Sequence, residues 1–374
     1  MRIREFLLEV WLNPRAPAAK YNLGSSCMKP LEVDELFKLI GQDTNVFLEE
    51  VRNMDLHYGH FFGMPRLLDA LSKLYKNVTP DMILSVHGGT GANNMVVTEF
   101  IEPGDNVVAI YPNYQQHYST PEWLGAEVRY LELNEKDGYL PDIERLKSLV
   151  DKNTKMITLS NPNNPTGAFI GADMLKDIAD IARKFGTYVL SDEIYRGLGE
   201  DAYMPSMADL YERALVTSST SKVFSMAGTR VGWIVAPEKE AHDRLMNRRS
   251  YDTICNGVFD ELITAIAIEN AERIFDRNRK IMNTNRAILE DWMKTQPRLT
   301  SDYKSEAPIR FFKYDYNISA TEFGDTLFDD YGVCVCQGDV FEIPKSFRLG
   351  YGYVEEGTFK EGLRILGDYM KTLD

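Results

Sequence analysis

The sequence predicts an α/β protein with a mostly parallel sheet covered by helices on both faces, together with a second, smaller domain. From about residue 80, short apolar runs alternate with helical stretches, which is the rhythm of βαβ units. The runs are rich in Val, Ile and Leu and lack polar alternation, as in strands buried on both faces. The length of 374 residues exceeds the roughly 250–300 residues at which a single core stops growing. We therefore expect a three-layer α/β/α domain and one further domain.

The expected elements follow the chain in order. The N-terminal segment 1–17 interrupts its apolar residues with Glu5 and Glu9, so it predicts an amphipathic helix and lacks the apolar core of a signal peptide. Apolar residues at helical spacing then predict crossover helices between the strands. The expected strands are 106–111, 155–159, 188–190, 215–218 and 231–236, and the expected helices are 95–101, 141–150 and 174–185.

The C-terminal part has a different pattern. Residues 258–294 have helical spacing and many charges, and after Pro297 shorter strand-like runs follow at 309–314, 333–336 and 347–351. We expect a large domain at 44–280 and a smaller α+β domain built from both chain ends, 1–43 and 281–374. No repeat or long Gly/Ser linker separates them, so a cleft between the two domains is the expected site.

Composition excludes several classes of protein. The 42 Lys+Arg and 56 Asp+Glu residues give a formal charge of −14, which opposes binding to nucleic acid and to anionic membranes. No run approaches the roughly 20 apolar residues that span a bilayer. The cysteines, Cys27, Cys255, Cys334 and Cys336, form no CxxC pair, so we expect no disulfide framework, no metal site and a reducing cytoplasm. Buried packing is the better interpretation of the two C-terminal thiols.

One lysine stands among hydroxyl groups directly after a predicted strand. Lys222 ends the run 218–222 (SSTSK), and Arg230 follows eight residues later. Hydroxyls and an arginine together suit a phosphate group. A lysine near a strand end can also be partly desolvated and neutral, as attack on a carbonyl requires. A solvated loop lysine is the alternative that this segment alone leaves open.

Three further segments indicate ligand binding. Asp192 lies where a strand ends, which is where open α/β sheets bind ligands, although a helix N-cap is an equal alternative. The segment 160–167 (SNPNNPTG) forms a turn that can aim an amide into a cleft, or is an ordinary turn. The glycine-rich run 87–94 (HGGTGANN) opens a helix whose backbone amides can receive a phosphate, although it matches no nucleotide-binding motif and can be a plain tight turn.

In order and spacing, these four segments resemble the class I and II aminotransferases of the fold type I pyridoxal 5′-phosphate (PLP) enzymes, over nearly the whole chain. The resemblance implies that Lys222 is the Schiff-base lysine and that Asp192 is the partner of the pyridine nitrogen. Tyr195 and Asn164 then bind the phenolic oxygen of the ring. The remaining implied cofactor contacts are Gly91, Ala92, Ser219 and Arg230 at the phosphate and Tyr114 stacked on the ring.

The same resemblance implies the substrate contacts and the assembly. Arg348 corresponds to the arginine that binds the substrate α-carboxylate, a task for a bidentate guanidinium. Gly24 and Asn164 are the other expected substrate-binding residues. Tyr58 resembles the tyrosine that reaches the phosphate of the neighbouring subunit, which implies a homodimer.

The implied function is transfer of an amino group between an L-amino acid and a 2-oxo acid in a ping-pong cycle, with the freed lysine as general base. Segments 24–30 and 305–310 depart from the commonest aspartate or aromatic patterns, so the substrate side chain is not predicted. A carbon–sulfur β-lyase on the same scaffold is the nearest alternative. A non-catalytic ligand sensor is more remote, since no winged-helix segment precedes the domain, and a PLP-free dehydrogenase lacks its fingerprint.

Overall fold

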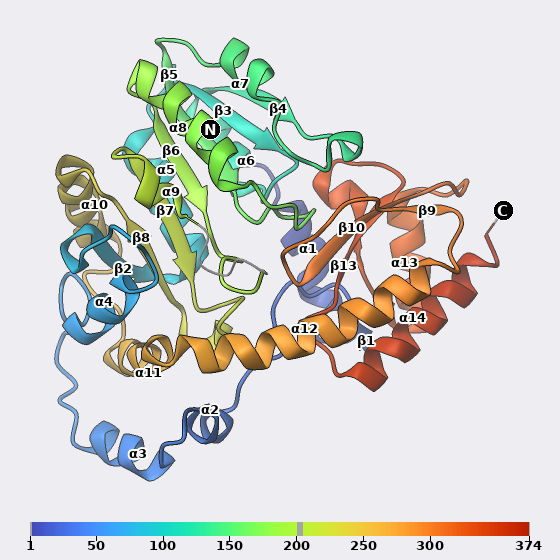
Figure 1. Cartoon of the computed structure of the whole chain (residues 1–374), viewed down its shortest axis with the longest axis horizontal. Coiled ribbons are helices and arrows are strands. Elements are labelled where there is room, and N and C mark those ends of the chain that lie inside the picture. The colour runs from blue at the N-terminus through green and yellow to red at the C-terminus, as the bar shows by residue number, and fades with distance from the viewer. Residues whose placement is uncertain (1, 200–204, 374) are drawn as a thin grey trace.

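The computed structural model describes residues 2–199 and 205–373 (Figure 1). The larger lobe is built around a seven-stranded sheet of order β2-β8-β7-β6-β5-β3-β4. Strand β8 runs opposite to the other six strands of this sheet, which all point the same way, so the predicted mostly parallel α/β arrangement is confirmed. The strands are β2 (Ile83–His87), β3 (Asn106–Tyr111), β4 (Glu127–Glu132), β5 (Thr154–Ser160), β6 (Tyr188–Asp192), β7 (Ala214–Ser219) and β8 (Val231–Val235).

Helices cover both faces of this sheet. Buried apolar side chains form separate clusters on the two faces of the sheet. Alternate residues of one strand belong to different clusters, with Val107 in one and Val108 in the other. Leu190 and Val189 of β6 are divided in the same way, as the twofold repeat of a strand requires. The helices of this lobe are α4 (Pro65–Ser72), α5 (Gly88–Phe100), α6 (Gln116–Leu124), α7 (Ile143–Leu149), α8 (Ala172–Phe185), α9 (Met207–Leu210), α10 (Lys239–Asp252) and α11 (Val258–Glu269).

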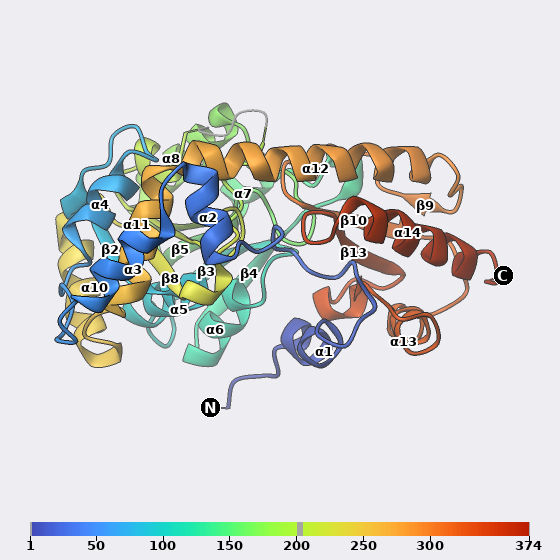
Figure 2. The ribbon, with the colours of Figure 1, turned by 90° about the horizontal axis from the view of Figure 1, so that it is seen from below.

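The smaller lobe contains segments from both ends of the chain (Figure 2). The chain ends meet where β1 (Tyr21–Asn22) pairs in parallel with β11 (Val333–Cys334). A separate antiparallel sheet of order β12-β13-β10-β9 forms the rest of the core. Its strands are β9 (Leu299–Thr300), β10 (Ile309–Tyr314), β12 (Cys336–Gln337) and β13 (Ser346–Gly350), and the helices of this lobe are α1 (Leu7–Arg15), α13 (Ala320–Tyr331) and α14 (Glu356–Met370).

Two further elements connect the lobes. The 23-residue α12 (Ala271–Met293) starts beside the large sheet and runs along the smaller lobe (Figures 1 and 2). The N-terminal chain passes in the opposite direction through α2 (Val33–Ile40) and α3 (Thr44–Arg52). The expected domain boundaries near residues 43 and 280 stay a prediction. Short 3-10 helices occur at η1 (Pro80–Met82), η2 (Glu135–Asp137), η3 (Ala227–Thr229) and η4 (Gly338–Phe341).

The structure corrects several sequence-based boundaries. The helix expected at 95–101 already begins at Gly88, so the glycine-rich run forms its first turns. Strand β4 was not predicted, because it is a polar edge strand with no continuous apolar run. The helical stretch 258–294 is divided at Asn270, and the expected strand 333–336 is divided between two sheets at Val335.

The cysteines are free thiols, and Cys334 and Cys336 are fully buried, as predicted. Among residues 2–199 and 205–373, no helix is long and apolar enough to cross a membrane.

Candidate active site

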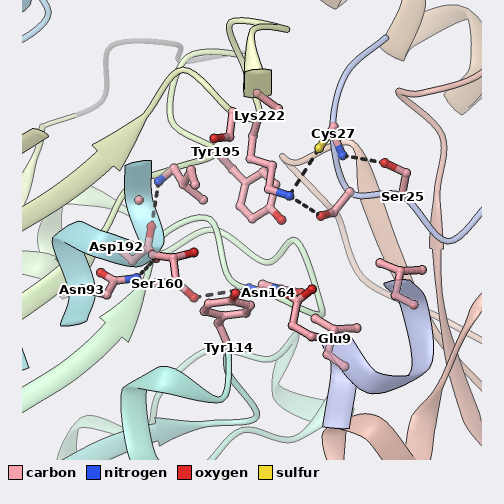
Figure 3. Close-up of a pocket in the computed structure, with 18 of the residues that line it drawn as sticks. Glu9, Ser25, Cys27, Asn93, Tyr114, Ser160, Asn164, Asp192, Tyr195 and Lys222 are labelled. Atoms are coloured by element: carbon pink, nitrogen blue, oxygen red, sulfur yellow. Dashed lines mark hydrogen bonds between the residues drawn. The ribbon is translucent and has the colours of Figure 1, made fainter. Parts of the chain in front are cut away.

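A cavity of about 250 Å³ lies where β5, β6 and β7 end, opposite α1 and residues 25–27 (Figure 3). Both lobes line it, as the expected cleft requires. Seven of the residues singled out in the sequence contribute to its wall: Tyr114, Asn164, Asp192, Tyr195, Lys222, Arg230 and Arg348.

Asp192 supplies a buried carboxylate at the end of β6. Its Oδ2 atom accepts a 2.8 Å hydrogen bond from Nδ2 of Asn93, and its Oδ1 atom accepts one of 3.1 Å from the backbone N–H of Ile194. The Nε2 atom of His117 lies 3.5 Å from Oδ2. Within residues 2–199 and 205–373, no Lys or Arg nitrogen lies within 4.0 Å of this carboxylate. Asp192 can therefore still bind a positively charged group of a ligand.

Lys222 extends into the cavity from the loop after β7. Its Nζ atom lies 3.0 Å from Oγ of Ser26 and 3.4 Å from Sγ of Cys27. Figure 3 shows the Tyr195 ring beside the lysine side chain. Burial lowers the pKa of Lys222, but the Cys27 thiol and the Tyr195 hydroxyl raise it, and the net shift is upward. The amine thus lies among groups that can exchange a proton with it.

A second corner of the cavity suits a phosphate group. Gly88 begins α5 with φ +71°, and a Cβ atom there would lie 2.6 Å from Nη2 of Arg230. A Cβ atom at Gly232 would lie 2.5 Å from the carbonyl carbon of Gly88. The backbone of β8 therefore lies directly against the backbone at the start of α5, with no room for a side chain between them. In the described chain Arg230 has no carboxylate partner within 4.0 Å. An unpaired guanidinium beside backbone amides at a helix start binds anions.

Not every predicted phosphate contact lines this corner. Gly91 and Ala92 lie further along α5 and are absent from the cavity wall, where Gly89 and Thr90 stand instead. Ser219 is fully buried behind the wall, and its Oγ atom accepts a 3.2 Å hydrogen bond from the backbone N–H of Ser221. Their roles at the phosphate stay a prediction.

Arg348 lies on β13 with only 1% of its surface exposed. Its Nη1 atom donates to Oδ1 of Asn164 at 2.8 Å, and Nη2 donates to the backbone oxygen of Gly24 at 2.8 Å and to Sγ of Cys336 at 3.0 Å. Its buried Nε atom has no hydrogen-bond partner in the described structure, and no carboxylate there lies within 4.0 Å of it. A buried cation without a counter-ion is costly, so an anionic ligand is the expected partner.

The three predicted tyrosines take different positions. Tyr195 is buried in the cavity wall. Tyr114 packs against Phe6 with ring centroids 4.9 Å apart, and its hydroxyl donates to Oε1 of Glu9 at 3.1 Å. Tyr58 is 65% exposed and does not line the cavity of its own chain, so the structure does not bring it to this site.

Sequence reasoning assigned no role at the site to Asn93, Glu9, Ser26, Cys27 or His117. Asn93 lies in the glycine-rich run, which the sequence predicts to bind a phosphate. Its position in this run was the signal that could have identified it as a site residue. Nothing in the sequence marked Glu9, Ser26, Cys27 or His117 as neighbours of Lys222 or Asp192, because α1, the following loop and α6 reach the cavity only through tertiary packing.

Comparison with known proteins gives consistent matches. The family model for aminotransferase class I and II matches residues 27–366. A crystal structure of a PLP-dependent aminotransferase from Streptococcus suis 89-1591 is similar over 100% of this chain and 99% of that chain, with 36% identity and a TM-score of 0.96. The aspartate aminotransferase of Pyrococcus horikoshii is 29% identical over 311 residues, 80% of this chain and 77% of that protein. The tyrosine aminotransferase of Dictyostelium discoideum is 25% identical over 369 residues, 90% and 85% of the two chains.

Proposed function

The chain belongs to the class I and II aminotransferases, which are PLP-dependent enzymes, and we propose that the cavity between the lobes is its active site. In this proposal Lys222 attaches the cofactor covalently and Arg348 binds the α-carboxylate of the amino acid. The observation that carries it is the placement, in one cavity, of a reachable amine and a buried guanidinium that has no counter-ion among the described residues.

The residues present fit PLP. The cofactor carries a ring nitrogen that must stay protonated, a phosphate and an aldehyde. The buried Asp192 carboxylate, with no Lys or Arg partner in the described chain, suits the protonated nitrogen. Arg230 and the start of α5 suit the phosphate. Asn164 and Tyr195 line the cavity between these two corners and suit the phenolic oxygen.

When bound, PLP supplies an electron sink that stabilises the charge left on the substrate Cα after proton removal. Once the substrate amine had displaced Lys222 from the cofactor, the freed Lys222 amine would take this proton as general base and hold it for the later return step. Arg348, oriented by Asn164 and by the Gly24 carbonyl, fixes the carboxylate and hence the direction of the Cα–H bond. Hydrolysis by water would release the 2-oxo acid and leave the amino group on the cofactor until the acceptor enters, which predicts ping-pong kinetics.

We also propose a homodimer in which Tyr58 enters the site of the neighbouring subunit. Support comes from exposed apolar side chains on two nearby segments, since patches of this kind mark protein interfaces. They are Leu56, Tyr58, Phe61 and Phe62 on one segment and Tyr251, Ile254 and Phe259 on the other.

The free thiols suit a reducing compartment such as the cytoplasm.

Borohydride reduction of the holoenzyme followed by peptide mass spectrometry tests the proposal. We expect the cofactor adduct on Lys222 and stoichiometric oxo-acid formation from an amino donor and an acceptor. An adduct on another lysine would overturn the assignment. Release of pyruvate and ammonia from a cysteine conjugate, without amino transfer, would instead support the β-lyase.

A further inference from the structure

Among the described residues of the cavity wall, Glu9 has a carboxylate that the proposed chemistry does not use. Glu9 lies on α1, and Figure 3 shows it directed toward Tyr114 at the cavity. Its Oε1 atom accepts the Tyr114 hydroxyl hydrogen bond at 3.1 Å. For Oε2 the described residues provide no hydrogen-bond partner, and no basic nitrogen of these residues lies within 4.0 Å of the carboxylate. One oxygen of Glu9 is therefore available to a ligand.

Each basic residue of the described cavity wall has a proposed role other than pairing with Glu9. The basic residues in the described wall are Lys222, Arg230 and Arg348. In the proposed function the first two serve the cofactor and the third serves the α-carboxylate. No basic residue of this wall is then left to bind a second carboxylate at the end of a substrate side chain. Glu9 would also repel such a group.

Glu9 also acts on the region around Arg348. Burial raises the pKa of the Cys336 thiol, Arg348 opposes this shift, and Glu9 adds to it. Cys336 contacts Nη2 of Arg348 at 3.0 Å, so the charges of Arg348 and Glu9 both act on this thiol. Glu9 and Arg348 line the same cavity, and the side chain of a substrate held by Arg348 therefore shares this cavity with the Glu9 carboxylate.

The wall beside Glu9 is apolar. Leu8 and Leu12 line the cavity from the same helix, one residue before and three residues after Glu9. Apolar walls accommodate a methylene stem, and a carboxylate beside them accommodates a polar or cationic end.

We propose that Glu9 is a specificity-determining residue that disfavours dicarboxylic amino acids and favours substrates with an aliphatic stem ending in a cationic or hydrogen-bond-donating group. This inference rests on the proposed function, because it takes Arg348 as the α-carboxylate site. It goes beyond the family membership, whose members named above include an aspartate and a tyrosine aminotransferase.

Three carboxylic acids without an α-amino group provide a test that does not depend on turnover. These are 5-guanidinopentanoate, hexanoate and glutarate, which share one carboxylate for Arg348 and differ in whether the far end is positive, neutral or negative. Calorimetry on the holoenzyme gives their dissociation constants at fixed pH and ionic strength. We expect 5-guanidinopentanoate to bind best and glutarate worst, with a ratio of dissociation constants of at least about tenfold.

The variant Glu9→Gln keeps an acceptor for Tyr114 and removes only the charge. We expect it to reduce the glutarate to 5-guanidinopentanoate ratio by roughly tenfold. Glu5→Gln is the matched control, since Glu5 is exposed, lies in the same N-terminal segment and does not line the cavity. An unchanged ratio in Glu9→Gln, or tighter binding of glutarate than of 5-guanidinopentanoate by the unsubstituted enzyme, overturns the inference.

Failure of the proposed function gives a different result. If Arg348 is not the carboxylate site, Arg348→Lys weakens none of the three acids, and both the proposed function and the inference are wrong. If all three acids depend on Arg348 but glutarate binds best, only the role of Glu9 is wrong. Turnover of L-arginine, L-norleucine and L-glutamate, compared as kcat/KM with one acceptor, should follow the same order as the binding constants.

Discussion

Asn93 donates a 2.8 Å hydrogen bond from Nδ2 to Oδ2 of Asp192, which joins α5 to the carboxyl end of β6. The Oδ1 atom of Asn93 accepts a second bond, of 2.6 Å, from Oγ1 of Thr217 on the neighbouring strand β7. All three side chains are buried. A hydroxyl donor on one side and a carboxylate acceptor on the other fix which end of the amide faces Asp192. Asn93 therefore sets the position of the carboxylate proposed to bind the cofactor nitrogen.

Replacement of Asn93 by Ala should weaken both the fold and the cofactor site. The change leaves Oδ2 of Asp192 and the Thr217 hydroxyl without these partners, which costs about 1–3 kcal/mol for each buried group. We expect a lower free energy of unfolding and a higher dissociation constant for PLP. Thermal unfolding and cofactor titration measure the two effects. The control is Asn94→Ala on the exposed face of the same helix, and equal effects of both variants would contradict the bridging role.

The sequence was informative at the ends of the buried strands β6 and β7. Asp192 and Lys222 could be identified because the apolar strands before them are visible as continuous runs. The contact between Asn93 and Asp192 spans 99 residues, and the one between Tyr114 and Glu9 spans 105. No local pattern indicates which helix face meets which strand end, so these neighbours could not be predicted. Strand β4 was not predicted for a different reason. It lies at the exposed edge of the sheet, where polar residues are tolerated, so its sequence contains no continuous apolar run.

A methyl group at Gly88 should disturb the proposed phosphate corner. The residue has φ +71°, and the new Cβ atom would lie 2.6 Å from Nη2 of Arg230. Gly88→Ala must therefore strain the backbone and displace the guanidinium. We expect the dissociation constant of PLP to rise by at least about tenfold, or roughly 1.4 kcal/mol.

Gly91→Ala provides the control for this prediction. A Cβ atom there would meet only Cβ of His87, at 3.8 Å, and the residue lies inside α5. Since alanine is the better helix former, this variant should gain about 0.5–1 kcal/mol of stability while keeping its backbone N–H for any phosphate contact. Equal cofactor affinity in both variants would show that the close approach at Gly88 does not shape the site.

Arg348→Lys should impair substrate binding more than cofactor binding. A lysine keeps the charge, but it cannot contact Asn164, the Gly24 carbonyl and a carboxylate in one plane as a guanidinium does. We expect KM for the amino donor to rise by about a hundredfold, with an unchanged absorbance spectrum of the bound cofactor. Arg364→Lys on the exposed face of α14 is the control. Loss of PLP from Arg348→Lys would mean that the arginine serves the cofactor.

Lowering the pH should destabilise the protein through His242. This imidazole is 7% exposed and stacks on Phe62 with ring centroids 6.4 Å apart. Burial lowers its pKa below the ordinary value of 6.5, although hydrogen bonding to Ile83 and the charges of Asp243 and Asp81 partly oppose the shift. Below about pH 6.5 the unfolded chain thus binds more protons than the folded one, and stability falls with pH until the folded pKa is passed.

The variant His242→Leu isolates this contribution, because leucine does not titrate. Between pH 7.5 and 5 the unsubstituted protein should lose free energy of unfolding relative to the variant, with a slope of up to about 1.4 kcal/mol per pH unit. Urea unfolding at several pH values measures the difference. If His242→Leu and the unsubstituted protein respond identically to pH, burial does not lower the pKa of His242 in the folded state, and the pKa is the same in the folded and unfolded chains.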